Sequence, residues 1–460
     1  MTTLRSPLPG PTPRGQRLRE LLQGSPYVSY LYSYPHKTAH RRLEPPVPLQ
    51  PLWSGERRDG LFLYIHVPFC AVRCGYCNLF SNKRRPAPEQ VGRFIDTLER
   101  QARVTRDALG SARFARFAMG GGTPTTLGLD QLARCLDVAQ RIMGADLEAI
   151  PSCVEVSPET ASADRLQLLR RRGIDRISVG VQSFHEGELR ALRRQQSPAT
   201  VHAVLDRVQE LGFPTLNVDL IYGIEGQDER CLEASLDQTL RHQPREVFLY
   251  PLYVRPLTQL GAHPAAAREC WNAQRLALYR TGRRRLLAAG YRQHSMRMFR
   301  REETDRDASP GTRYSCQDDG MVGLACGARS YTERLHYSTE WAVSPGAVEE
   351  LIEAYIARSD RSFSEAQHGI HLDEEDRRRR HVLLSLLQAE GMDLGQYRQR
   401  FGGEAWDQLP ELRELQALEL ARLDGERLRL TEAGLERSDM IGPWLHSARV
   451  QQLIDSYHLR

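Results

Sequence analysis

Three cysteines are crowded into one short segment of the chain, LFLYIHVPFCAVRCGYCNLF, at positions 70, 74 and 77. Thiolates spaced C-x3-C-x2-C on a loop can wrap around one compact soft-metal centre. Iron–sulfur clusters are usually held by four cysteines, so three leave one iron open to bind a cofactor or substrate. A structural zinc site is the alternative, but zinc prefers paired ligands and four closed positions, and no second CxxC pair occurs. The spacing favours a [4Fe–4S] cluster held by Cys70, Cys74 and Cys77.

The cysteines follow the first of six short β-rich runs, and amphipathic segments separate these runs. The runs are residues 61–67, 114–119, 153–156, 176–181, 216–221 and 247–250, and the amphipathic segments include 89–108, 129–143, 161–172, 198–211, 229–241 and 267–289. Such alternation predicts parallel strands covered by helices. Because a complete barrel of this kind needs eight units, we predict an α/β fold with a partial (β/α)6 barrel.

Polar and glycine residues mark several of these runs. Residues 120–124, GGGTP, follow the second run, and glycine lets a backbone approach a ligand closely. Glu155 stands in the third run, where an unpaired buried carboxylate is costly; a salt bridge at the strand end is the alternative. Gln182 and Asp219 interrupt the apolar runs of the fourth and fifth strands. Barrel enzymes build their active sites at the carboxyl ends of the strands, so we expect these residues to meet there.

The rest of the chain divides into regions of different character. We expect an N-terminal arm (1–59), a barrel core (60–300), a connecting region on the substrate side (301–370), a small winged-helix-like domain (371–445) and a tail (446–460). Residues 291–345 should be irregular and residues 346–445 mainly helical. The arm should be extended apart from a short helix near Leu18, because prolines at 45, 46, 48 and 51 disfavour helix and central strand. Near the end, LRLTEAGLERSDMIGPWL is read as strand, turn and strand.

The composition excludes several classes of protein. The 460 residues carry a net charge of +5, too weak to predict a nucleic-acid partner. No apolar stretch approaches the roughly 18 residues of a membrane span, and the N-terminus has no secretory signal. Nine cysteines, an odd number, do not suggest a disulfide framework. Residues 373–380, DEEDRRRR, are expected to form a solvated, salt-bridged helix face. We therefore expect a cytoplasmic, monomeric protein that binds neither nucleic acid nor membrane.

The motifs resemble a known family. CAVRCGYC matches the CxxxCxxC signature of the radical SAM superfamily, whose members bind S-adenosylmethionine (SAM). GGGTPTTL (120–127), EVSPE (155–159), RISVGVQSF (176–184) and NVDLIYG (217–223) follow in the family's order. Together with YIHVPFC and GYCNLF, they resemble the subgroup of oxygen-independent coproporphyrinogen III oxidase, the related heme chaperone and the class C radical SAM methylases. The resemblance covers residues 60–440.

The resemblance implies two cofactors, the [4Fe–4S] cluster and SAM. In the family, the reduced cluster donates an electron to SAM bound at the open iron, and SAM splits to methionine and a 5′-deoxyadenosyl radical. A protein of this kind positions the cofactor and substrate and excludes side reactions. We accordingly expect a small-molecule substrate, a tetrapyrrole or another compound, and a low-potential electron donor such as flavodoxin or ferredoxin.

The resemblance also implies which residues contact SAM. They are Tyr64, Gly121, Gly122, Thr123, Glu155, Gln182, Arg194 and Asp219, with Tyr64, Glu155 and Arg194 catalytic. Arg193 could contact SAM in place of Arg194, and Tyr64 could instead be an ordinary aromatic residue of the strand. For His66, a role in the site and a role in packing are both open. Cys316 and Cys326, which lie in a segment resembling the family's GLGxGA, are expected to pack rather than react.

The chain departs from the family pattern in places that bear on function. The heme-chaperone branch carries HNxxYW where this chain reads TRYSCQDDGMVG (312–323), and Glu225 replaces a usual proline. Tyr, His and Arg of the arm either bind a carboxylate-bearing substrate or simply pack. The function expected is oxidative decarboxylation of a tetrapyrrole in porphyrin biosynthesis, like that of coproporphyrinogen III oxidase. A class C methyltransferase and a heme-binding chaperone-like protein are the alternatives.

Overall fold

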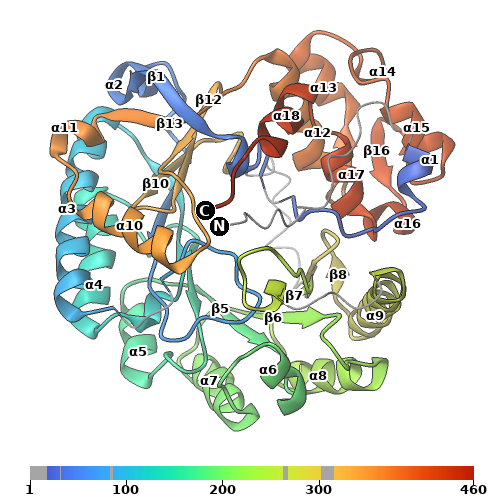
Figure 1. The fold of residues 1–460 in the computed structure, drawn as a ribbon, viewed down its shortest axis with the longest axis horizontal. Helices are drawn as coiled ribbons and strands as arrows, with labels where there is room; N and C mark the ends of the chain where they lie inside the picture. Colours follow the sequence, from blue (N-terminus) through green and yellow to red (C-terminus); the bar gives the residue numbers. More distant parts are fainter. Residues whose placement is uncertain (1–17, 32, 83–85, 263–267, 302–314) are drawn as a thin grey trace, which may run out of the picture.

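The computed structural model describes residues 18–31, 33–82, 86–262, 268–301 and 315–460. Within these residues, thirteen strands form one curved sheet in the order β1-β13-β12-β11-β10-β2-β3-β4-β5-β6-β7-β9-β8, and the elements form a ring (Figure 1). Six strands run parallel in chain order at its centre, as predicted: β2 (Leu61–Val67), β3 (Phe114–Gly121), β4 (Ser152–Val156), β5 (Arg176–Gln182), β6 (Thr215–Tyr222) and β7 (Glu246–Pro251).

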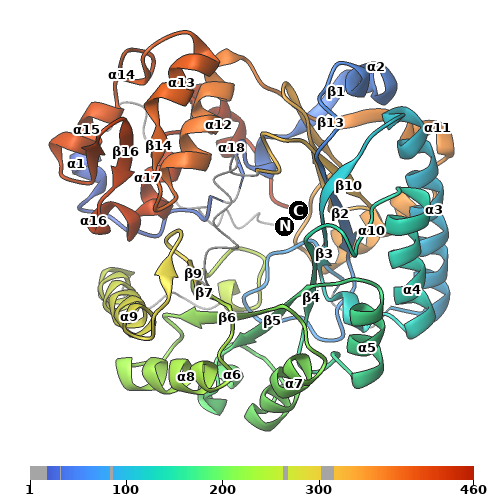
Figure 2. The same cartoon turned by 180° about the vertical axis from the view of Figure 1, so that it is seen from behind.

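Helices on the outside of the ring connect these strands (Figure 2). They are α3 (Pro88–Leu109), α4 (Leu129–Asp137, continued by a π-helical turn Val138–Ile142), α5 (Ala163–Arg171), α6 (Glu186–Ala191), α7 (Pro198–Glu210), α8 (Glu229–Arg241) and α9 (Arg268–Ala288). Caps fix their starts: Ser197 accepts from the Thr200 N–H, and Asp228 accepts from the Cys231 N–H. The prediction of six strand–helix units is confirmed; only the short α6 was not predicted.

The prediction that residues 291–345 are irregular is wrong for those that the structure describes. β10 (Met321–Leu324) pairs parallel with β2, and β11 (Arg329–Tyr331), β12 (Leu335–Ser338) and β13 (Glu365–His371) continue the sheet. On the far side, β9 (Met298–Arg300) and β8 (Arg292–Gln293) follow β7. Most of these strands have two to four residues, too few for a period-two pattern. Residues 302–314, including 312–314 of TRYSCQDDGMVG, lie outside the described part.

The N-terminal arm is more structured than predicted. β1 (Arg41–Pro48) pairs with β13 at the edge of the sheet, and its register shifts between Arg42 and Val47. Prolines are tolerated at an edge and at a bulge because no ladder hydrogen bond is lost. In α2 (Leu49–Ser54), Pro51 lies in the first turn, where its missing N–H has no intrahelical acceptor. α1 (Leu18–Leu21) is where a short helix was predicted.

The C-terminal part forms a winged-helix-like domain. A three-stranded sheet, β14 (Met392–Asp393), β16 (Arg427–Leu430) and β15 (Ala421–Asp424), packs with α12 (Glu374–Leu386), α13 (Leu394–Phe401), α14 (Ala405–Gln408) and α15 (Leu412–Ala417). The predicted final strand is wrong: α16 (Glu432–Leu435) and α17 (Ser438–Trp444) follow β16, because the Thr431 hydroxyl caps a helix there.

The charged run of α12 is only partly a solvated face. Glu374 and Glu375 pair with Arg378 and Arg379 one turn later, as predicted. Asp376 is fully buried, however, and accepts from Tyr34 Oη (2.9 Å) and Ser447 Oγ (2.7 Å). Arg380 is likewise buried, with Nη1 donating to the carbonyl oxygens of Thr332 and Glu333. The run therefore joins the C-terminal domain to the N-terminal arm and the sheet.

The N-terminal arm packs against the last part of the chain and against the C-terminal domain. The chain after α17 folds into α18 (Ala448–Asp455), beside the short 3-10 helix η1 (Lys37–Ala39). Leu18 and Tyr34 of the arm belong to the hydrophobic core of the C-terminal domain, which is separate from the core of the barrel. None of the helices in the described residues combines the length and apolar character needed to cross a bilayer.

Candidate active site

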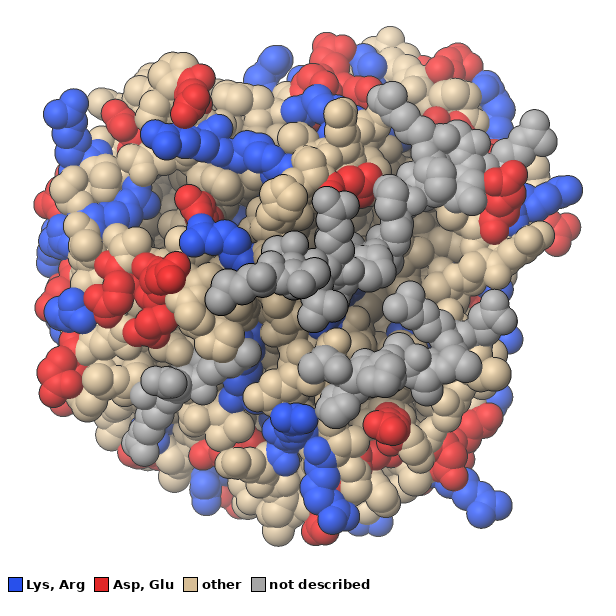
Figure 3. Space-filling view, viewed as in Figure 1, with Lys and Arg blue, Asp and Glu red and all other residues tan. Residues whose placement is uncertain are grey.

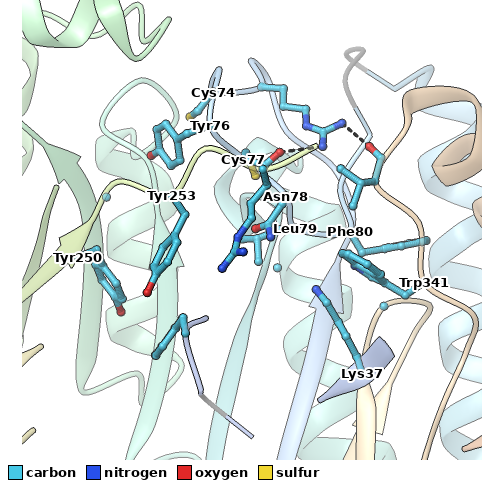
Figure 4. Close-up of a pocket in the computed structure, with 18 of the residues that line it drawn as sticks. Lys37, Cys74, Tyr76, Cys77, Asn78, Leu79, Phe80, Tyr250, Tyr253 and Trp341 are labelled. Carbon is cyan, nitrogen blue, oxygen red and sulfur yellow. Dashed lines mark hydrogen bonds between the residues drawn. The ribbon is translucent and has the colours of Figure 1, made fainter. Parts of the chain in front are cut away.

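A cavity of about 670 Å³ opens at the carboxyl ends of the parallel strands. The cysteine loop lies over it, with Tyr250 and Tyr253 on one side and Lys37 and Trp341 on the other (Figure 4). The outer surface on the face seen in Figure 1 carries acidic and basic side chains intermixed (Figure 3). The cavity, rather than a surface patch, is therefore where the chemistry-bearing residues gather.

All three predicted cluster ligands line this cavity: Cys70, Cys74 and Cys77. Their loop is closed by the Asn82 N–H donating to the Pro68 carbonyl (2.7 Å). Arg73 clamps it, donating to the carbonyl oxygens of Val343 (2.9 Å) and Cys77 (2.8 Å). In the described part of the chain, no three His, Cys, Asp or Glu side chains lie close enough to hold a single metal ion. A four-iron cluster instead distributes its cysteine ligands over separate irons, which suits thiols spread around a cavity.

The surroundings of Cys70 and Cys77 favour the protonated thiols when no metal is bound. Burial raises the pKa of Cys70 to about 12 and also raises that of Cys77, with the neighbouring thiols adding to both shifts. Arg194 Nη1 donates to Cys74 Sγ at 3.1 Å, and Thr123 Oγ1 lies 3.7 Å from Cys70 Sγ. A bound cation deprotonates coordinating thiols outright. The three residues thus fit a cationic iron centre that supplies the missing charge.

The glycines at the end of β3 make room for neighbouring protein groups. A Cβ on Gly120 would lie 2.5 Å from a Glu155 carboxylate oxygen, one on Gly121 2.4 Å from the His66 ring, and one on Gly122 2.5 Å from the Phe69 carbonyl. The N–H of Gly121 donates to Glu155 Oε2 (3.2 Å), and that of Gly122 to the Val67 carbonyl (2.7 Å). Since these N–H groups are used internally, the loop is better suited to accept from an ammonium group than to donate to an anion.

Two carboxylates face the cavity from β4 and β6, Glu155 with its side chain exposed there and Asp219 half-buried. Burial raises the pKa of Glu155 to about 7, opposed by its hydrogen bond from Gly121 and increased by the charge of Asp219. Burial likewise raises the pKa of Asp219 to about 6, although Asn217 Nδ2 (2.8 Å) and Ser178 Oγ (3.3 Å) donate to it. A cation bound between the two would restore both charges.

Tyr64 and His66 form a hydrogen-bonded pair on β2. His66 Nε2 lies 2.8 Å from the Phe80 carbonyl, which only accepts, so Nε2 carries the proton and Nδ1 accepts from Tyr64 Oη at 3.2 Å. Burial lowers the pKa of His66 to about 4, so the ring is neutral. Both side chains line the cavity, although Tyr64, like Asp219, lies within its strand rather than at its end.

Arg194 reaches the cavity and Arg193 does not. Arg194 Nη2 donates to the Gly180 carbonyl at 2.6 Å while Nη1 contacts Cys74. Arg193, with a positive φ of 54°, directs Nη1 to Gln259 instead. Gln182 also lines the cavity, with φ +69° where β5 shifts register at its end. The structure therefore brings Tyr64, Glu155, Gln182, Arg194 and Asp219 to one cavity with the cysteines and with Gly121, Gly122 and Thr123.

Sequence reasoning missed several other residues that line the cavity. Tyr250 lies near the end of β7 and Tyr253 follows this strand. They lie at the edge of the sheet that was used to select the other residues, so the same rule would have found them. His36, Lys37, Trp341 and His446 also line the cavity, and they carry no local signal because distant segments bring them together. Cys326 is buried, as expected, and neither it nor Cys316 lines the cavity.

Comparison with known proteins places these features in a family context. The radical SAM superfamily matches residues 64–239, and the HemN C-terminal domain matches residues 372–436. The heme chaperone HemW of Escherichia coli is 30% identical over 58% of this chain and 69% of that protein. The oxygen-independent coproporphyrinogen III oxidase of Pseudomonas aeruginosa is 26% identical over 81% of this chain and 83% of that protein. A further heme chaperone is matched over about half, 51%, of its own length.

The fold comparison agrees. The solved structure of coproporphyrinogen III oxidase (HemN) from E. coli aligns with a TM-score of 0.73 at 21% identity, covering 96% of this chain and 99% of that one. The arrangement of barrel, arm and C-terminal domain is therefore shared with that structure.

Proposed function

The chain belongs to the radical SAM superfamily, in the group of oxygen-independent coproporphyrinogen III oxidase and the heme chaperone HemW, and we propose that it is an enzyme that cleaves SAM at a [4Fe–4S] cluster. The observation that carries this proposal is that Cys70, Cys74 and Cys77 line one cavity with Glu155 and Arg194. Three thiols from one loop, with a cation and a carboxylate beside them, provide groups for a cluster and for both ends of an amino acid.

The proposed roles follow from the charges. When bound, the cluster and SAM supply a 5′-deoxyadenosyl radical that abstracts a hydrogen atom. Arg194, beside Cys74, is placed to pair with the SAM carboxylate. Glu155 and Asp219, with the loop at Gly121–Thr123, suit the cationic parts of SAM. Tyr64 and Gln182 complete the wall.

The reaction that we propose is oxidative decarboxylation of a tetrapyrrole propionate, fed by a low-potential donor such as flavodoxin or ferredoxin in the cytoplasm. Support comes from the P. aeruginosa oxidase, which is similar over 81% of this chain. A heme-chaperone-like role is the second candidate, favoured by the 30% identity with HemW of E. coli. Methyl transfer is a third outcome that product analysis distinguishes.

The test is anaerobic reconstitution with iron and sulfide, reduction, addition of SAM and mass spectrometry for 5′-deoxyadenosine. The wild type should form it, and Cys74→Ala should lose the cluster and at least about 100-fold of the activity, because a ligand of the reacting metal is removed. Cys231→Ala is the matched control, since this half-buried cysteine lies on α8, away from the cavity. Equal activity in Cys74→Ala and wild type would overturn the proposal.

Product analysis with coproporphyrinogen III then separates the reactions. Carbon dioxide supports the decarboxylase, S-adenosylhomocysteine supports a methyltransferase, and retention of heme without either product supports the chaperone-like role.

A further inference from the structure

Part of the cavity wall comes from segments of the chain that lie outside both family matches. Lys37 lies before the radical SAM region, Trp341 lies between it and the HemN C-terminal domain, and His446 lies after that domain. These residues are therefore not explained by the shared SAM chemistry.

Lysine is rare in this chain. The chain has 63 Lys and Arg residues, and only two of them, Lys37 and Lys83, are lysine. In a chain that uses arginine almost everywhere, one of the two lysines lies in the cavity. Lysine carries a compact charge with three donors on a slender stem, so it reaches a small anion where the larger guanidinium group does not fit as well.

Trp341 supports the lysine. Lys37 Nζ lies 3.8 Å from the centre of the Trp341 ring, and Figure 4 shows both side chains on the same side of the cavity. A cation over an aromatic face is attracted by the negative face of the ring, so the ring helps to hold the ammonium group at the cavity wall. His446 lines the same cavity, and burial lowers its pKa to about 4, so its ring is neutral and Lys37 supplies the positive charge.

The wall is held in place by the N-terminal arm and the last part of the chain. Tyr457 Oη donates to the Trp341 carbonyl at 2.6 Å, and Arg41 Nη2 donates to Ser456 Oγ at 2.9 Å. His36 caps the turn that carries Lys37 by accepting from the Thr38 N–H. The charges of Lys37 and Arg329 both lower the pKa of His66, so this wall is electrostatically coupled to the Tyr64–His66 pair.

We propose that Lys37 and the Trp341 ring beside it form a subsite that recognises a carboxylate of the substrate and so determines which substrate this chain accepts. The inference rests on the proposed function, because it assigns the substrate side of the same cavity. Lys37 supplies the charge and the hydrogen-bond donors, and the ring of Trp341 supports the lysine.

Chemical footprinting tests the subsite without any substitution, because acylation of Lys37 can be compared with and without a carboxylate ligand. The protein, reconstituted with its cluster, is treated with a lysine-acylating reagent, and acylation of Lys37 is quantified by mass spectrometry. Coproporphyrin III should slow acylation of Lys37 by about tenfold. Its tetra-amide, which keeps the ring but removes every carboxylate, is the control and should not protect Lys37. Equal acylation of Lys37 with and without coproporphyrin III would overturn the assignment.

Variants provide the second readout. Lys37→Met should bind coproporphyrin III at least about tenfold more weakly but bind the tetra-amide as the wild type does, and Lys37→Arg should keep the preference for the acid. Substrate-free 5′-deoxyadenosine formation is measured for both variants beside the wild type. Loss of that formation in the wild type would mark failure of the proposed function. Normal formation with no preference for the acid would mark failure of the subsite alone.

Discussion

The two sides of the cavity are built by different means. On the side that we assign to SAM, the cysteine loop follows β2, and Glu155 and Asp219 lie in β4 and β6 of the same run of parallel strands. On the side that we assign to the substrate, Lys37, Trp341 and His446 come from segments separated by about 300 and 100 residues of intervening chain. The first side is fixed by the register of the barrel and the second by contacts between the N-terminal arm, the last part of the chain and the C-terminal domain. The proposed roles therefore assign the chemistry and the substrate choice to parts of the chain that are built separately.

One buried ion pair joins the C-terminal domain to the chain beside the barrel strand β9, and its loss should have the largest effect on stability. Arg297 forms a buried ion pair with Asp439 of α17, and Tyr253 also donates to Asp439. Arg297→Met leaves that carboxylate buried without its cation, so the free energy of unfolding should fall by about 3–5 kcal/mol in denaturant titrations. Arg398→Met, which breaks the exposed pair with Glu404, should cost under about 1 kcal/mol. A similar loss in the free energy of unfolding in the two variants would show that the buried pair stabilises the protein no more than an exposed pair does.

The SAM side should respond to its carboxylates. Glu155→Gln removes a negative charge that we assign to a cationic part of SAM, and the dissociation constant of SAM should rise by about tenfold or more, measured by equilibrium dialysis. Glu225→Gln, an exposed position outside the cavity, should bind SAM normally. An unchanged dissociation constant in Glu155→Gln would remove this residue from the SAM site.

The same carboxylates make SAM binding dependent on pH. Their raised pKa values, about 7 for Glu155 and about 6 for Asp219, mean that both are largely neutral at pH 5 and largely charged at pH 8. Affinity for cationic SAM should therefore increase as pH rises from 5 to 8, by roughly tenfold, and Glu155→Gln should lose the upper part of this rise. A flat profile in the wild type would argue against carboxylate contacts.

The smallest effect is expected for a residue that only positions Trp341, and it tests whether the two sides of the cavity act separately. Tyr457→Phe removes the hydrogen bond to the Trp341 carbonyl, so coproporphyrin III should bind about fivefold more weakly, while SAM binds as before. Tyr291→Phe is the control, because Tyr291 also donates to a backbone carbonyl, that of Pro244, but lies outside the cavity. Weaker SAM binding in Tyr457→Phe would show that the two sides are not independent.

The way each side of the cavity is built also explains which of its residues could be predicted from the sequence. The six strands and most helices have lengths and periodicities that are read locally, and the residues at their carboxyl ends meet because parallel strands bring those ends together. Arg194 was identified correctly as the arginine that reaches the cavity, whereas Arg193 points to Gln259. The roles in SAM binding stay predictions.

The features that were missed depend on contacts over long distances. β8 to β12 are too short to show a pattern, and Pro51 is compatible with α2 only because it lies in the first turn. Asp376 and Arg380 belong to a run that reads as solvated, but their partners come from the arm and from the chain around β12. Lys37 and Trp341 meet for the same reason, and no window of sequence around either one contains the other.

The most direct test of the central claim is electron paramagnetic resonance of the reduced, reconstituted protein with and without SAM. If Cys70, Cys74 and Cys77 hold a four-iron cluster with one open iron, the reduced protein should give a [4Fe–4S]⁺ signal that changes when SAM binds that iron. Cys74→Ala should give no such signal. A protein that takes up zinc but not iron, or a cluster signal that SAM leaves unchanged, would contradict the account.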